Sequence, residues 1–205
     1  MKSFLRKDIE LALIFALLFT LAMNFAHFNA ACDDLRNNVL RLHIIANSDS
    51  KPDQAVKLKI RDEILNASSG IFKECESLPA AIENAKENLD KISKTANNVL
   101  KENGFDYEAI VSVGNSYFET REYENFTLPA GTYKSLIVRL GKSKGHNWWC
   151  VIFPSVCLSA SGNARLEDAT SITSARIAEN PKKYVMRFKS VELYENLKKK
   201  IKGKK

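Results

Sequence analysis

The residues that could do chemistry are few, and most stand in one stretch of the chain. His43, Ser48 and Asp49 are the residue types of a hydrolytic triad. A hydrolase of that kind places its serine in a G-x-S-x-G elbow between a strand and a helix, and we expect no such elbow in this sequence. Asp49 and Ser50 are common helix caps, and His43 stands alone on a predicted strand. We therefore interpret them as structural and predict no enzyme activity.

Gly141-Lys142-Ser143-Lys144-Gly145 has the residue types of a phosphate-binding loop without its spacing. A P-loop reads G-x-x-x-x-G-K-[ST] and opens a helix, whereas a strand is predicted after this segment. With 3 His, 4 Cys and no C-x-x-C pair, a metal site is not expected either. We predict no cofactor and no catalytic residue.

The charge of the chain is concentrated at its C-terminus. The 205 residues carry a net charge of +7, but residues 182–205 alone hold ten Lys or Arg and two Glu. The body of the chain is close to neutral, which argues against a nucleic-acid-binding surface. The basic tail, 190–205, is either a solubilising end or a contact for an anionic membrane or wall polymer.

The N-terminus is typical of an export signal. Lys2, Arg6 and Lys7 precede the apolar run Leu11–Met23. The segment is either a signal cleaved after Ala31 or an uncleaved anchor; lipidation at Cys32 is a third alternative. We predict residues 1–31 as the signal or anchor and 32–205 as a single extracytoplasmic domain.

Export changes how two cysteines are interpreted. Cys150 and Cys157 are separated by six residues that include Pro154, which favours a reversal of the chain. In an oxidising compartment we predict that the two form a disulfide. The alternative is a pair of buried thiols on an apolar strand.

Hydrophobic periodicity predicts the elements. Val39–Ala46 alternates as a strand with Leu40, Leu42 and Ile44 on one face. A helix follows to about Gly70, with Lys57 among its outward residues. A second helix opens near Ser77 and Pro79, carries an apolar stripe from Ile82 to Val99, and ends at Asn103-Gly104. Gly114-Asn115-Ser116 is predicted as a hairpin turn. The later segments that we expect are strands 133–140 and 148–153, a helix over 164–179, a strand over 184–188, and a helix over 191–201 with Val191, Tyr194, Leu197 and Ile201 inward.

This order predicts an α+β fold. We expect a two-layer domain with a mainly antiparallel sheet and helices packed on it, preceded by the N-terminal signal or transmembrane helix.

Four blocks of the sequence resemble the stage II sporulation protein R family. They are R41-LHIIANSDS-50, D53-QAVKLKIRD-62, L128-PAGTY-133 and G145-HNWWCVIFP-154. The resemblance implies a signalling protein that is exported across the forespore membrane into the intermembrane space. There it would activate the membrane-embedded aspartic protease that processes pro-sigma-E.

Large amphipathic rings beside a polar loop are common at protein interfaces, and Trp148-Trp149 follows such a loop. The contact surface that we predict for the protease consists of Trp148, Trp149, the Lys142–Asn147 loop with His146 and Asn147, and Arg41, His43, Asn47 and Asp49.

The alternative function is a peptidoglycan hydrolase or wall-binding protein in the same intermembrane space.

Overall fold

A computed structural model describes residues 2–72, 74–123, 125–155 and 165–202. In them a four-stranded sheet has the order β2-β5-β1-β6. β1 pairs in parallel with β5, while β1–β6 and β2–β5 are antiparallel. The predicted α+β class with a mainly antiparallel sheet is confirmed, and the parallel pair makes the sheet mixed. The strands are β1 (Leu40–Ile45), β2 (Ala109–Phe118), β5 (Gly131–Leu140) and β6 (Asn147–Phe153).

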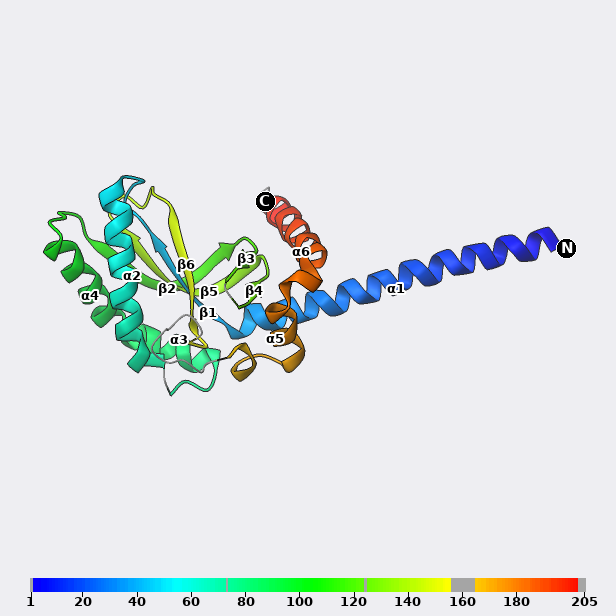
Figure 1. The fold of residues 1–205 in the computed structure, drawn as a ribbon, viewed down its shortest axis with the longest axis horizontal. Coiled ribbons are helices and arrows are strands. Elements are labelled where there is room, and N and C mark those ends of the chain that lie inside the picture. Colours follow the sequence, from blue (N-terminus) through cyan, green and yellow to red (C-terminus); the bar gives the residue numbers. More distant parts are fainter. Residues whose placement is uncertain (1, 73, 124, 156–164, 203–205) are drawn as a thin grey trace.

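Three helices cover one face of the sheet (Figure 1). Alternation along β1 turns Leu40, Leu42 and Ile44 toward them, and all three side chains are fully buried. This main core is the helical layer that the sequence predicts. The helices are α2 (Lys51–Phe72), α3 (Leu78–Glu87) and α4 (Leu89–Glu102).

The opposite face of the sheet is also covered. Leu35 near the end of α1 (Lys2–Asn38), with Ala175 and Ala178 of α5 (Ile172–Glu179), packs in one cluster with Val151 of β6. The short strands β3 (Arg121–Glu122) and β4 (Thr127–Leu128) and the 3-10 turn η1 (Leu166–Asp168) complete this layer. The two faces of the sheet therefore have separate cores.

Two predictions for the helices were wrong in detail. α2 continues past Gly70 to Phe72. The second helical segment begins after Ser77 and ends at Asn103 as predicted, but it is two helices that meet at Asn88, which caps the end of α3 and the start of α4. The Asn88 side chain donates a 2.8 Å hydrogen bond to the Asn84 carbonyl, so a polar cap interrupts an otherwise continuous apolar stripe.

The predicted hairpin at Gly114-Asn115-Ser116 is also wrong. β2 continues through these residues, and each of its ten positions has a partner in β5. Because β5 is equally long, pairing along its whole length outweighs the local turn preference of Gly and Asn.

The C-terminal segments form one helix, α6 (Pro181–Lys202), so the strand expected over 184–188 is wrong. Pro181 is its first residue, a position where proline is well tolerated. α6 turns Phe188, Val191 and Glu195 inward. Of the four residues predicted to face inward only Val191 is buried; Tyr194, Leu197 and Ile201 are exposed. The helix expected over 164–179 is the 3-10 turn η1 followed by α5.

α1 is one continuous helix that extends far from the domain (Figure 1). Within the described residues, one helix is long and apolar enough to cross a membrane; it spans Asp8–Asn38 and has a window of mean hydropathy 2.1. The predicted boundary at residue 31 lies inside this helix. Phe28 and Cys32 are buried against α5 and α6, so the domain begins to pack before that boundary.

Candidate functional site

Two loops meet at one end of the sheet, and we call them the loop junction: residues 46–50 after β1 and residues 141–146 before β6. The backbone N–H of Gly145 donates to the Ala46 carbonyl at 2.9 Å, and that of Lys144 donates to the Asn47 carbonyl at 3.1 Å. A Cβ atom on Gly145 would lie 2.2 Å from the Ser48 carbonyl oxygen. The approach of the two backbones therefore requires glycine at this position.

The Asp53 carboxylate is the centre of the loop junction. It accepts hydrogen bonds from Asn47 at 2.9 Å, from the Tyr107 hydroxyl at 2.6 Å, and from the Ser48 hydroxyl. Burial alone would raise the pKa of Asp53, but these hydrogen bonds outweigh it and hold the pKa below its usual value. A buried, ionised carboxylate thus organises the turn between β1 and α2.

Asn47 and Lys57 connect that turn to the second loop. The Asn47 side chain accepts a 2.8 Å hydrogen bond from the backbone N–H of Lys142. The Lys57 ammonium donates to the His146 carbonyl at 3.0 Å and to Gln54 at 2.5 Å. Lys57 was predicted to point outward, and it is buried instead; burial lowers its pKa.

Asp49 and His146 form an exposed pair on the surface of the loop junction. One carboxylate oxygen of Asp49 accepts from the His146 backbone N–H at 2.6 Å and from its ring Nδ1 at 2.5 Å. These hydrogen bonds lower the pKa of Asp49. The predicted contact residues Asn47, Asp49, His146 and Asn147 therefore lie together at this end of the sheet.

The Gly141–Gly145 segment also matches the G-x-S-x-G pattern around Ser143, a match that the interpretation as a phosphate loop overlooked. Ser143 has a positive φ of 54°, as a residue in a tight turn can have. The turn joins two strands, whereas a nucleophile elbow joins a strand to a helix. Among the described residues no hydrogen bond links Ser143 to His146, and Ser48 and His43 bond Asp53 and Ser116 instead.

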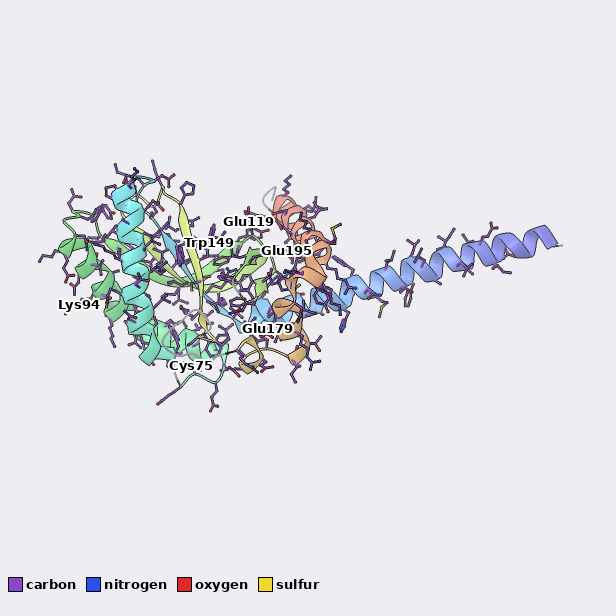
Figure 2. The ribbon with its side chains drawn as sticks, viewed as in Figure 1. Cys75, Lys94, Glu119, Trp149, Glu179 and Glu195 are labelled. Carbon is purple, nitrogen blue, oxygen red and sulfur yellow. The ribbon has the colours of Figure 1, made fainter. Side chains whose placement is uncertain are left out.

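The two tryptophans lie on opposite faces of β6. Trp149 pairs with His43 across the strands and packs in the second core, whereas Trp148 borders the main core. Each ring is half-buried beneath an arginine: the guanidinium carbon of Arg61 lies 4.5 Å from the Trp148 ring centroid, and that of Arg121 lies 4.5 Å from Trp149. Figure 2 shows the position of Trp149 on β6. The two rings cannot form one patch.

Arg41 is fully buried and does not belong to an accessible surface. Its guanidinium carbon lies 3.8 Å from the ring centroid of Phe118 and 4.8 Å from that of Tyr133, and Nη2 donates to the Tyr123 hydroxyl at 2.5 Å. Nε and Nη1 have no hydrogen-bond partner among the described residues. This placement argues against a direct contact between Arg41 and a partner protein.

His43 is half-buried on the same face as Arg41. Its Nδ1 lies 3.2 Å from the Ser116 hydroxyl, and its ring is next to Phe118 and Trp149. Burial lowers its pKa, and the Arg139 and Arg41 cations add to this effect. His43 is therefore a packing residue of the second core.

The predicted disulfide stays a prediction. Cys150 is buried on β6, and Cys157 lies outside the described residues.

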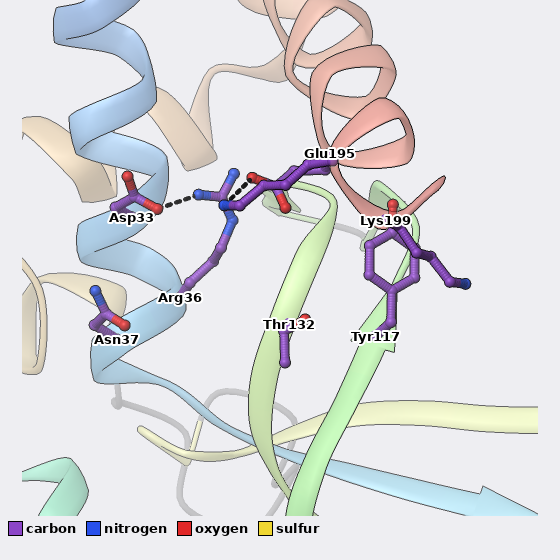
Figure 3. Close-up of a pocket in the computed structure, with 8 residues that line it drawn as sticks. Asp33, Arg36, Asn37, Tyr117, Thr132, Glu195 and Lys199 are labelled. Atoms are coloured by element: carbon purple, nitrogen blue, oxygen red, sulfur yellow. Dashed lines mark hydrogen bonds and ion pairs between the residues drawn. The ribbon is translucent and has the colours of Figure 1, made fainter. Parts of the chain in front are cut away.

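A pocket of about 620 Å³ lies between α1, α6 and the ends of β2 and β5 (Figure 3). Arg36 reaches into this region from α1; it donates to Asp33 at 2.5 Å and to the Ala130 carbonyl at 2.9 Å. On the far wall the Tyr117 hydroxyl donates to Asn196 of α6 at 2.9 Å. The bond between Tyr117 and Asn196 connects α6 to β2, whereas the bond from Arg36 to Ala130 connects α1 to the residue before β5.

Sequence reasoning missed Lys57 and Tyr107 as members of the loop junction. Lys57 lies one turn after Asp53, on the side of α2 that also carries the buried Val56 and Ile60. That spacing is the signal that could have identified it. Tyr107 comes from a distant loop and carries no local signal.

Comparison with known proteins identifies the family. Residues 36–163, which contain the sheet, α2–α4 and the loop junction, match the family model described as stage II sporulation protein R. The stage II sporulation protein R of Bacillus subtilis (strain 168) is 34% identical over 121 residues, which are 59% of this chain and 54% of that protein. The match thus spans about half the length of the curated relative. No solved structure matches the chain. The match to the family model covers more than half of the sequence, and the chain belongs to the stage II sporulation protein R family.

Proposed function

We propose that this protein is an exported, membrane-anchored signal that activates the membrane-embedded aspartic protease processing pro-sigma-E, and that the loop junction is its contact surface. Membership of the family supports the sporulation role. The apolar helix α1 fits export or anchoring. The observation on which the contact surface depends is the rigid attachment of exposed residues to a buried carboxylate: Asp49 and His146 stand on loops that Asp53 and Lys57 hold.

A rigid loop suits this task, because activation requires that one state of the protease be bound better than the other. A shift from 1:99 to 99:1 needs about 5.5 kcal/mol of differential affinity. Loops already held in one conformation lose little entropy on binding, so more of the contact energy is available for discrimination.

The test is reconstitution of the full chain with the protease and pro-sigma-E in vesicles. The contact variant replaces the exposed side chains Lys142, Lys144 and His146 by Ala, and the matched control replaces Lys91, Lys94 and Lys101 of α4. Lys94 lies on the side of the domain opposite to the one from which α1 extends (Figure 2). We expect at least a tenfold loss of precursor cleavage in the contact variant, about the effect of losing one hot-spot residue, and none in the control. Equal activity of the two variants would refute the assignment of the surface.

The same assay distinguishes activation of the protease from the alternative function, peptidoglycan hydrolysis. Ser143→Ala removes the hydroxyl of the G-x-S-x-G segment and leaves the contact side chains in place. Unchanged precursor cleavage is expected. Loss of cleavage, accompanied by loss of a peptidoglycan-hydrolysing activity of the wild-type chain, would favour the hydrolase.

A further inference from the structure

Helix α6 has an apolar stripe that the domain leaves uncovered. The buried side of the helix is defined by Phe188, Val191 and Glu195. At about 100° per residue, the opposite side carries four large apolar side chains. Their exposed fractions are 77% for Met186, 63% for Leu193, 51% for Leu197 and 69% for Ile201.

Basic residues flank this stripe on both edges. Lys182, Lys189 and Lys200 border one edge at helical spacing, and Arg187 and Lys198 border the other. The acids of α6 lie elsewhere: Glu195 is buried against the domain, and Glu192 is half-buried next to it. An apolar face between two rows of cations is the pattern of a helix that lies in a membrane interface.

The position of α6 relative to α1 indicates what covers the exposed apolar stripe. Figure 1 shows α6 crossing α1 at a steep angle, where α1 leaves the domain. Phe28 of α1 contacts Phe188 and Tyr184, with ring centroids 5.3 and 5.7 Å apart. One turn nearer the N-terminus, Phe25 contacts Tyr194 at 6.1 Å, and Tyr194 borders the stripe. The stripe thus begins level with the last exposed apolar turn of α1.

The length of α1 places a bilayer at that level. Residues 8–25 of α1 are exposed and mainly apolar, and as a helix they span about 27 Å, close to the hydrocarbon thickness of a bilayer. If α1 crosses the membrane, a helix that crosses α1 steeply at residue 25 lies close to the membrane plane.

We propose that α6 lies on the surface of the bilayer that α1 crosses, with Met186, Leu193, Leu197 and Ile201 in the lipid and its lysines and arginines at anionic headgroups. The occupant of the stripe is therefore lipid, and not a second copy of this chain or another protein. α6 lies outside residues 36–163, which match the family model, so the inference does not follow from the family. It requires that α1 be retained, but it does not require activation of a protease.

The test uses the full chain in nanodiscs that contain phosphatidylglycerol. A benzophenone amino acid replaces Leu197 in one sample and Lys94 in the control. After illumination we expect lipid adducts at position 197 only. An adduct with a second protein chain, or no adduct at position 197, would overturn the proposal.

The electrostatic part has its own test. Position 197 should crosslink several-fold less lipid in phosphatidylcholine nanodiscs, because the attraction between the basic residues and the headgroups is lost. Equal yields in the two lipids would refute the role of the basic rows.

A second readout is the rate at which trypsin cleaves α6 in nanodiscs. Leu193→Ser with Leu197→Ser should raise this rate by about tenfold or more, since each leucine contributes strongly to lipid binding. Ile110→Ser, at an exposed position on β2, is the matched control and should not change it. No difference between the variants would exclude lipid burial of the stripe.

Discussion

The Tyr107 hydroxyl donates a 2.6 Å hydrogen bond to Asp53, a residue that stands more than fifty positions earlier in the chain. This contact closes the loop junction from the side of β2. Because Asp53 is buried and accepts several hydrogen bonds, Asp53→Asn should lower the free energy of unfolding by about 1–3 kcal/mol. Thermal unfolding of the full chain in detergent measures this, and the exposed Asp62→Asn is the control.

The same carboxylate gives a pH dependence. Its folded pKa lies below the value of about 3.9 for an unfolded Asp, so its contribution to stability is present above that value and is lost as the pH falls through the folded pKa. The stability difference between wild type and Asp53→Asn should therefore be largest at neutral pH and shrink below pH of about 4. A difference that is constant down to acidic pH would contradict this account.

Gly145→Ala tests the backbone approach at the loop junction. The added Cβ would meet the Ser48 carbonyl oxygen, which cannot move without breaking the hydrogen bonds between the two loops. We expect a loss of about 2 kcal/mol or more, measured by thermal unfolding. Gly70→Ala is the matched control: nothing lies within 4 Å of its Cβ, and inside a helix this exchange should stabilise by about 0.5–1 kcal/mol.

How far the sequence determines these features depends on the range of the interactions. Alternation in β1 and the apolar stripe of α4 are local patterns, and they predicted the strand and the helical layer correctly. The hairpin at Gly114 failed because ten residues of β5 decide the length of β2. α6 was misjudged because it has two apolar sides, one against α1 and one exposed, and a sequence pattern cannot show which one meets the protein.

The predicted contact residues also differ in how far local sequence determines where they lie. The structure places Asn47, Asp49, His146 and Asn147 close together, because they lie in or next to the loops at the ends of neighbouring strands. Arg41 alternates with Leu40 and Leu42, which indicated the second face of the sheet. Only the structure shows that this face is covered, since Phe118, Tyr123 and Tyr133 come from distant segments.

Arg41 should act through stability. A buried cation with no carboxylate partner in the described part of the chain has lost its hydration. Its contacts with aromatic rings and one hydroxyl compensate for part of the free energy lost with that hydration. Arg41→Met keeps much of the volume and should change the free energy of unfolding by no more than about 1 kcal/mol, whereas Arg41→Ala should cost about 3 kcal/mol or more. Urea unfolding of both variants checks this order; a large loss in Arg41→Met alone would show that the charge itself is required.

The His43 ring offers a test by NMR titration. Because Arg139 is one of the cations that lower the pKa of His43, Arg139→Gln should raise that pKa. Arg139 is exposed on β5, so its replacement should leave the fold intact.

The depressed pKa of His43 also affects stability. Since the folded state resists protonation of His43, the free energy of unfolding should fall as the pH drops through about 6.5, the pKa of an unfolded His. His43→Gln should reduce this fall, and a chain that keeps the full slope without His43 would refute the assignment.

Phe28 tests whether the domain needs residues that signal cleavage would remove. Its ring is buried between Tyr184 and Phe188, so Phe28→Ala should loosen α6 from α1 at a cost of about 3–4 kcal/mol. Hydrogen exchange should then show faster exchange of the α6 amides, while those of β1 and β5 stay protected. Phe19→Ala, on the exposed part of α1, is the control and should leave α6 unchanged.

Cleavage of the chain after Ala31 would remove Phe28 and should loosen α6 in the same way. We therefore expect the mass of the protein isolated from membranes to include residues 1–31. A mature chain that begins at Cys32 and still protects α6 would contradict both expectations.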